Sequence, residues 1–128
     1  MPTIFAKATT TRTTGAHWED AALIYLQGNG LKLVERNFSC RFGEIDLILR
    51  DRDQLVFAEV RFRNAAARGD GTASVGAAKR VKLIRAAAVY LQAHPQSAAL
   101  ACRFDVVGCS GTPANPAFDW TRSAFDAC

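Results

Sequence analysis

The chain has 128 residues and a formal net charge of +4, and 49% of its residues are hydrophobic and 22% charged. This length suits one domain with a single sheet and its covering helices, and no stretch approaches the ~20 apolar residues of a membrane-spanning helix. We therefore expect a soluble globular protein without a membrane partner, in which the small positive charge favours polyanionic partners only weakly.

The N-terminal part of the chain predicts a tail followed by a helix. Residues 1–14 are rich in threonine and show no apolar periodicity, so we expect a flexible tail there and a single domain over residues 15–128. Apolar residues then recur at helical spacing up to the glycines at 28 and 30, which predicts an amphipathic helix over about 15–28. The residues on its apolar face are Trp18, Ala21, Ala22, Tyr25 and Leu26.

Three strands are expected next. Residues 31–40 alternate weakly between apolar and polar side chains, whereas 44–50 and 55–62 are rich in branched and aromatic residues. The polar turn at 51–54 joins the two stronger strands, so they are predicted to form a hairpin.

The remaining half of the chain predicts a helix followed by further strands. The small residues and glycines of 63–76 indicate a loop, and a long helix is predicted from about 73 to 93. A strand is expected over 102–109, and residues 118–127 are expected to form a short strand that runs into a helical turn. This order predicts an α/β (α+β) domain with a central mixed β-sheet flanked by α-helices.

The cysteines give no sign of a metal site or of disulfides. They include no C-x-x-C pair and have no histidine nearby at zinc-ligand spacing. The N-terminus also lacks the charged segment and apolar run of a signal peptide. We therefore expect free thiols in a cytoplasmic protein.

Acidic residues occur in both strands of the predicted hairpin. Because strand side chains alternate between faces, Glu44 and Asp46 share one face of their strand, and Glu59 and Arg61 share one face of the next. We expect the wholly apolar faces to pack against the core, which leaves Asp46, Glu59 and Arg61 together on the other face. A turn of about four residues would bring positions 46 and 59 to within about one pair of each other.

Two converging carboxylates repel each other and need a cation or a proton. Mg²⁺ or Mn²⁺ would suit this position, because such ions take one or two carboxylates and complete their coordination with water and substrate phosphate. With Arg61 to stabilise negative charge, the group would suit the hydrolysis of a phosphodiester. A cross-strand salt bridge on a solvated face would explain the same residues, and Asp105 is expected to be structural and paired with Arg103 or another arginine.

Six segments, in order, resemble the YraN-like family, a group of bacterial proteins in the restriction-endonuclease-like superfamily that is similar to archaeal Holliday-junction resolvases. The resemblance covers about residues 15–127. The segments are GAHWEDAALIYLQGNG, RNFSCRFGEIDLIL, VFAEVRFR, VGAAKRVKLIRAAAVYL, CRFDVV and SAF.

The resemblance implies a metal-dependent nuclease motif made of an acid on the first helix, then D, then E-x-K. By residue, Glu19 matches the helix acid, Asp46 the aspartate, Glu59 the glutamate and Arg61 the place of the lysine. It thus implies Glu19, Asp46 and Glu59 as ligands of Mg²⁺ and, with Arg61, as the catalytic residues of an endonuclease acting on DNA, including branched DNA. Resolvases of this kind act as dimers, which implies a homodimer, although no exposed apolar stripe in the sequence demands one.

Arg61 departs from the motif, because an arginine cannot act as a base. Lys79 is the candidate substitute, since it lies on the otherwise apolar face of the helix predicted over 73–93; the alternative is that its ammonium extends to solvent while its stem covers the core. Basic residues near the site in sequence are expected to contact nucleic acid, although an ordinary solvated surface would explain them nearly as well. They are Arg41, Arg63, Arg68, Lys79 and Arg80.

Two other classes of function stay open. A catalytically inactive nucleic-acid-binding or interaction protein that retains the nuclease fold is favoured by Arg61 in place of lysine. A structural adaptor with no nucleic-acid role is favoured by the modest net charge. Function depends on the site and not on the fold, so membership of a family does not decide between them.

Overall fold

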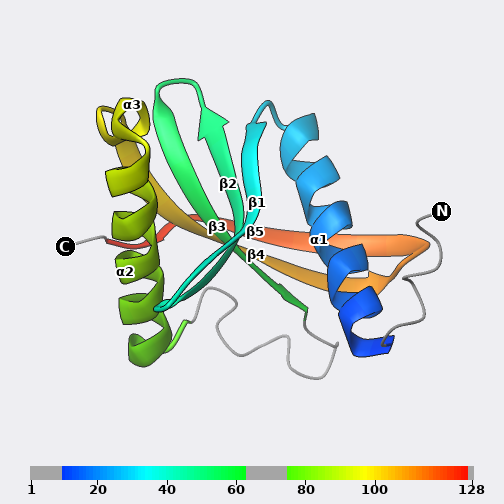
Figure 1. Ribbon diagram of the computed structural model, residues 1–128. Coiled ribbons are helices and arrows are strands. Elements are labelled where there is room, and N and C mark those ends of the chain that lie inside the picture. The colour runs from blue at the N-terminus through cyan, green and yellow to red at the C-terminus, as the bar shows by residue number, and fades with distance from the viewer. Residues whose placement is uncertain (1–9, 63–74, 127–128) are drawn as a thin grey trace, which may run out of the picture.

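The computed structural model describes residues 10–62 and 75–126 (Figure 1). Three helices and five strands are found in these ranges. In chain order they are α1 (Thr10–Gly28), β1 (Lys32–Cys40), β2 (Gly43–Asp51), β3 (Gln54–Phe62), α2 (Ala77–Ala93), α3 (Pro95–Ala98), β4 (Ala101–Thr112) and β5 (Asn115–Phe125).

The five strands form one mixed sheet in the order β1-β2-β3-β4-β5. Strands β3 and β4 are parallel and the other neighbours are antiparallel. Helix α2 lies in the connection between the two parallel strands, and α1 and α2 lie on opposite sides of the sheet (Figure 1). The predicted α+β fold, a central mixed sheet flanked by helices, is confirmed. None of the helices in the described part of the chain is long and apolar enough to cross a membrane.

Both faces of the β2–β3 hairpin are buried over most of its length, which corrects the expectation that only its wholly apolar face packs against a core. Leu47 belongs to a core cluster with residues of α1, whereas Ile48 and Phe57 belong to a second cluster with residues of α2. The face of β3 that carries Glu59 is therefore also covered by α2, next to Phe57. In β2 the alternation is broken around Asp46, because Ile45 belongs to the α2 cluster and Leu47 to the α1 cluster. Asp46 and Glu59 lie toward one end of a buried strand pair and not on a solvated face.

Helix α1 begins at Thr10, five residues before the predicted start at 15, so residues 10–14 are helical and do not belong to the expected tail. No proline interrupts this stretch, and a helix that has formed extends at little cost per residue. Residues 1–9 of the expected tail lie outside the described residues. Helix α2 is described from Ala77, and the expected residues 73 and 74 also lie outside the described part.

The helical turn expected near the C-terminus is wrong, since β5 continues as a strand to Phe125. The pairing of β5 with β4 shifts register between Phe104 and Val106, and Ser123 has a positive φ of 50°. At this irregularity the Ser123 N–H donates to Asp105 Oδ1 over 3.0 Å. A side-chain acceptor thus replaces the regular ladder there and allows the strand to bend without becoming helical.

Candidate active site

Strands β2 and β3 part at the level of Asp46. Their ladder runs from the connecting turn to the Leu47–Ala58 pair and stops there. Beyond this point β2 continues to pair with β1, and β3 continues to pair with β4. The Val60 N–H donates instead to Asp46 Oδ2 over 2.8 Å. A carboxylate has taken the place of a ladder carbonyl, and the strands open a site between them.

Asp46 and Glu59 act on each other electrostatically at this opening. Burial raises the pKa of Asp46 to about 7, and the negative charge of Glu59 adds to the effect. Burial also raises the pKa of Glu59, while the cationic side chains of Lys79 and Arg61 lower it. Exposed Glu44 raises the pKa of both carboxyl groups. Two half-buried carboxylates are thus held in a position where a cation would stabilise their charged forms.

Lys79 reaches this site from the first turn of α2. Its Nζ lies 3.5 Å from Glu59 Oε2, and its side chain is 49% exposed while that of Glu59 is 13% exposed. The Lys79 side chain is therefore half exposed, and its ammonium meets a carboxylate of the site and does not simply extend to solvent, which was the alternative expected for it. The site holds a lysine although Arg61 occupies the motif position, and half-buried Arg61 also acts electrostatically on Glu59.

Glu19 lies on α1, at the margin of the site. Its Oε1 accepts a hydrogen bond from Asn37 Nδ2 over 3.0 Å and is 3.5 Å from Arg36 Nη2. Its charge still raises the pKa of Asp46, so the two carboxylates are within electrostatic reach of each other. Within residues 10–62 and 75–126, no three His, Cys, Asp or Glu side chains are grouped so that they could hold a metal ion. The structure brings Asp46 and Glu59 together and leaves Glu19 bonded to β1.

The donor set of Asp46 and Glu59 fits a hard divalent cation. Both offer carboxylate oxygens, the ligands that Mg²⁺ and Mn²⁺ prefer, and Mg²⁺ is commonly held by one or two carboxylates with water and substrate completing its coordination. Their raised pKa values have burial as the main cause, which is the cost that a bound cation would offset. These two residues could hold such an ion without a third protein carboxylate.

The residues that were predicted to contact nucleic acid differ in their surroundings. Arg41 is exposed, and its Cζ lies 4.8 Å from the centroid of the Phe42 ring. Arg80 donates through Nε to the Val75 carbonyl over 2.8 Å and lies over the Phe125 ring, so it has a structural partner on each side. Arg63 and Arg68 lie outside the described residues.

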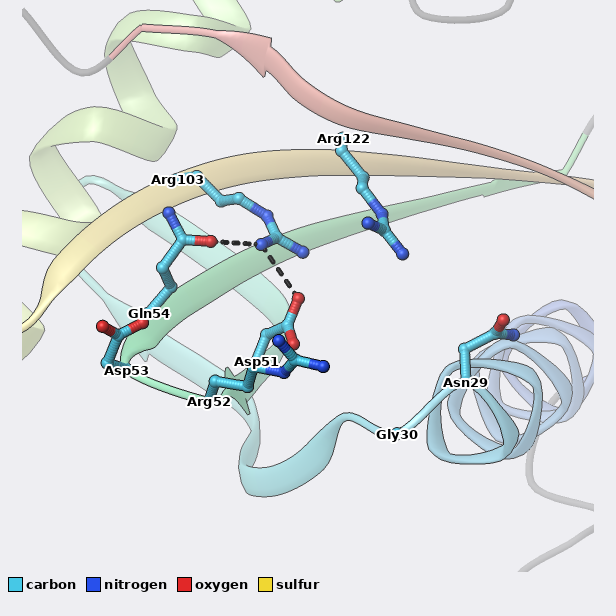
Figure 2. Close-up of a pocket in the computed structure, with 8 residues that line it drawn as sticks. All are labelled: Asn29, Gly30, Asp51, Arg52, Asp53, Gln54, Arg103 and Arg122. Carbon is cyan, nitrogen blue, oxygen red and sulfur yellow. Dashed lines mark hydrogen bonds and ion pairs between the residues drawn. The ribbon is translucent and has the colours of Figure 1, made fainter.

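A cavity of about 430 Å³ lies at the opposite end of the β2–β3 hairpin (Figure 2). It is lined by the turn residues 51–54 together with Asn29, Gly30, Arg103 and Arg122. Arg103 donates to Gln54 Oε1 over 2.6 Å and lies 3.0 Å from Asp51 Oδ2, the two contacts that are dashed in the figure. None of the predicted site residues lines this cavity, and Asp46 and Glu59 lie just beyond the last β2–β3 pair, Leu47–Ala58.

The raised pKa of Asp46 predicts that the metal-free protein loses stability as the pH rises from about 4 to about 7. Asp46 keeps its proton in the folded protein up to about pH 7, whereas the unfolded chain loses it near the ordinary value of 3.8. Folding therefore takes up a proton in this window, and the free energy of unfolding falls as the pH rises through it. Asp46→Asn keeps an acceptor for Val60 N–H and should flatten this dependence.

Thermal unfolding in EDTA between pH 4 and 8 checks this expectation. The variant should unfold at a higher temperature than the wild type at pH 8 and at a similar one at pH 4. Added Mn²⁺ should stabilise the wild type at pH 8 and leave Asp46→Asn almost unchanged. Parallel pH profiles for the two proteins would contradict the assignment of a raised pKa to Asp46.

The chain is similar to known proteins over most of its length, and the matched part includes the candidate site. The model of the uncharacterised protein family UPF0102 matches residues 18–109, which include Glu19, Asp46, Glu59 and Lys79. A UPF0102 protein of Chromohalobacter salexigens is 51% identical over 116 residues, covering 91% of this chain and 93% of that protein. One of Xanthomonas campestris is 52% identical over 111 residues, covering 87% and 89%, and one of Stutzerimonas stutzeri is 44% identical over 116 residues, covering 91% and 97%. UPF0102 is the YraN-like family, so the family resemblance drawn from the six segments is confirmed.

Proposed function

The chain belongs to the uncharacterised protein family UPF0102, and from the site that it carries we propose that it is a Mg²⁺- or Mn²⁺-dependent endonuclease that hydrolyses phosphodiester bonds in DNA. The observation that supports this most is the pair of Asp46 and Glu59 at the opening between β2 and β3, where burial and mutual repulsion raise the pKa of Asp46 to about 7. Structural carboxylates normally have partners that keep them ionised, whereas within residues 10–62 and 75–126 the main influences on Asp46, burial and the charge of Glu59, both raise its pKa.

Each residue of the site has a defined part in this function. Asp46 and Glu59 would hold the divalent ion, which supplies Lewis-acid polarisation of the phosphodiester when bound. Lys79 has three N–H donors 3.5 Å from Glu59 and can orient a water molecule or a phosphate oxygen there. Arg61 supplies a guanidinium group that stabilises negative charge in the transition state.

Glu19 has a positioning part in this proposal. Through Asn37 and Arg36 it ties α1 to β1, and its charge adds to the negative potential at Asp46. This potential favours cation binding at Asp46 and Glu59, although Glu19 itself contributes no ligand oxygen in this proposal.

A catalytically inactive nucleic-acid-binding protein is the second candidate. The specific observation in its favour is Arg61 at the motif position of lysine, because arginine cannot accept a proton from water. In such a protein Lys79 would serve only to neutralise Glu59. The homodimer and the branched substrate remain proposals that depend on the nuclease function.

The deciding experiment is a cleavage assay on labelled linear, flapped and four-way DNA with Mg²⁺, with Mn²⁺ and with EDTA. The wild type is expected to cut at least one substrate in the presence of metal and none in EDTA. Asp46→Ala should lose this activity, because it removes one of the two carboxylates that would hold the ion.

Asp119→Ala is the matched control, since Asp119 is an exposed acid on β5. Cleavage by Asp46→Ala at the wild-type rate would refute the metal assignment. DNA binding without cleavage under every metal condition would instead favour the inactive binding protein.

A further inference from the structure

Helix α2 carries four basic side chains and no acidic one. Lys79, Arg80, Lys82 and Arg85 all lie in the first nine residues of the helix, which runs from Ala77 to Ala93. Lys79, Lys82 and Arg85 are spaced three residues apart, so they follow one side of the helix, and all three are exposed. We call these three residues, together with Arg41, the basic track.

The turn between β1 and β2 lies against this side of α2 (Figure 1). A Cβ atom at Gly43 would lie 3.7 Å from the Cβ of Lys82, which shows how closely the turn approaches the helix. Two arginines lie over the Phe42 ring, with Arg41 Cζ at 4.8 Å and Arg85 Cζ at 5.7 Å from its centroid. The ring therefore joins the cations of the turn to those of the helix.

This arrangement is unfavourable for the helix itself. Positive charges in the first turn oppose the helix dipole, and Lys79 lies in that turn. Lys79 with Lys82, and Lys82 with Arg85, are like-charged neighbours that repel each other. Gly76 at the N-cap makes no side-chain capping bond that would offset this. Stability of α2 does not explain the basic track, and an anionic ligand would.

The track leads into the candidate active site. Lys79, at one end of it, lies 3.5 Å from Glu59, and the turn that carries Arg41 continues directly into β2 and Asp46. From Lys79 to Arg85 the helix rises about 9 Å. That distance matches the rise of roughly two to three nucleotides at about 3.4 Å each along one strand of nucleic acid.

We propose that the basic track binds the phosphodiester backbone of a nucleic-acid strand, without reading its bases, and guides it to Asp46 and Glu59. This inference rests on the proposed function only for the choice of a polynucleotide as the ligand. A guanidinium that stacks on a ring through its face still directs N–H groups outward along its edge, where phosphate oxygens can accept them. The Phe42 ring thus fixes Arg41 and Arg85 for phosphate contact.

Binding in EDTA tests this proposal separately from cleavage. We would measure the affinity of the full chain for labelled single-stranded and double-stranded DNA of equal length between 50 and 200 mM salt. Four cations predict that log K falls with log salt with a slope of about −3.6 on duplex or about −2.8 on a single strand. Removing Lys82 and Arg85 together by alanine should weaken binding and reduce the slope by about 1.4–1.8.

The matched control removes two positive charges from the end of the β1–β2 hairpin that is far from its turn. Lys32 and Arg50 are both exposed and are paired positions of β1 and β2, so Lys32→Ala/Arg50→Ala changes the net charge equally. This control should keep the wild-type slope, and two DNA sequences of the same length should bind equally well.

Equal weakening by the two double variants would overturn the proposal, because it would show that only net charge matters. Equally tight binding to vesicles of anionic lipid, with the same dependence on Lys82 and Arg85, would overturn it in favour of a membrane surface. If the wild type never cleaves DNA but the expected slopes are found, the basic track stands and only the nuclease function fails.

Discussion

Lys79→Met is expected to lower the rate of metal-dependent DNA cleavage by about 10²–10³-fold, the usual cost of removing one charged or hydrogen-bonding group from a transition state. The Lys79 ammonium is 3.5 Å from Glu59 and lies on the half-exposed side of the site, where a substrate phosphate would approach. Methionine keeps the unbranched stem and removes only the donor. Lys79 is half exposed, so solvent screens its pairing with Glu59 and the melting temperature should fall only slightly.

Arg61→Lys in the Lys79→Met background should restore part of the activity. It places a lysine at the motif position on β3, two residues after Glu59, and so supplies an ammonium from the strand in place of the one lost from the helix. Arg61→Lys alone should change the rate much less, because Lys79 is then still present. Recovery in the double variant would show that the motif lysine has moved from β3 to α2.

Single-turnover cleavage rates of the three variants would measure this effect, with Lys32→Met as a control that removes a lysine far from the site. A rate for Lys79→Met that equals the wild-type rate would mean that Lys79 only neutralises Glu59. Failure of Arg61→Lys to rescue would mean that position 61 no longer faces the substrate.

The sequence predicted most of the sheet because strands and hairpins have local signals. Alternation of side chains and the polar turn at 51–54 located β2 and β3, and the same alternation placed Asp46 and Glu59 on adjacent strands. It could not show that both faces of the hairpin are covered, because an alternating pattern that includes Ile48 and Phe57 fits a solvated face almost as well as a buried one. Only the packing of α2 decides this point.

The contacts of the site required the folded chain. Glu19 and Asn37 are 18 residues apart, and neither local pattern indicates that they bond to each other. Lys79 was recognisable as a charge on an apolar helix face, but its partner Glu59 was not. Lys82 and Arg85 were missed, although the absence of any acidic residue in residues 77–93 was a signal that could have identified them.

Asp105→Ala is expected to lower the free energy of unfolding by about 3–5 kcal/mol, the range for breaking a buried ion pair. Asp105 is 1% exposed. It accepts hydrogen bonds from Arg103, from Trp120 Nε1 over 2.9 Å and from the Ser123 N–H over 3.0 Å. Its loss would leave these donors without their acceptor, and among the described residues Arg103 would keep Asp51 and Gln54.

Chemical denaturation at pH 7 measures this loss, which corresponds to a fall of roughly 10–20 °C in melting temperature for a domain of this size. Asp119→Ala, at an exposed position on the same β4–β5 hairpin, should change the free energy of unfolding by less than about 0.5 kcal/mol. A loss below about 1 kcal/mol for Asp105→Ala would show that its donors find water or other partners.

Asp105 and Asp46 are both carboxylates within the sheet, but their partners differ. Asp105 has an arginine and two further donors, so its carboxylate serves the fold, whereas Asp46 has one backbone donor and faces Glu59. Removing the charge should therefore have opposite effects on the metal-free protein at pH 8: Asp105→Asn should destabilise it and Asp46→Asn should stabilise it. A carboxylate that costs stability where the fold does not need it is best explained by a ligand that the fold is built to bind.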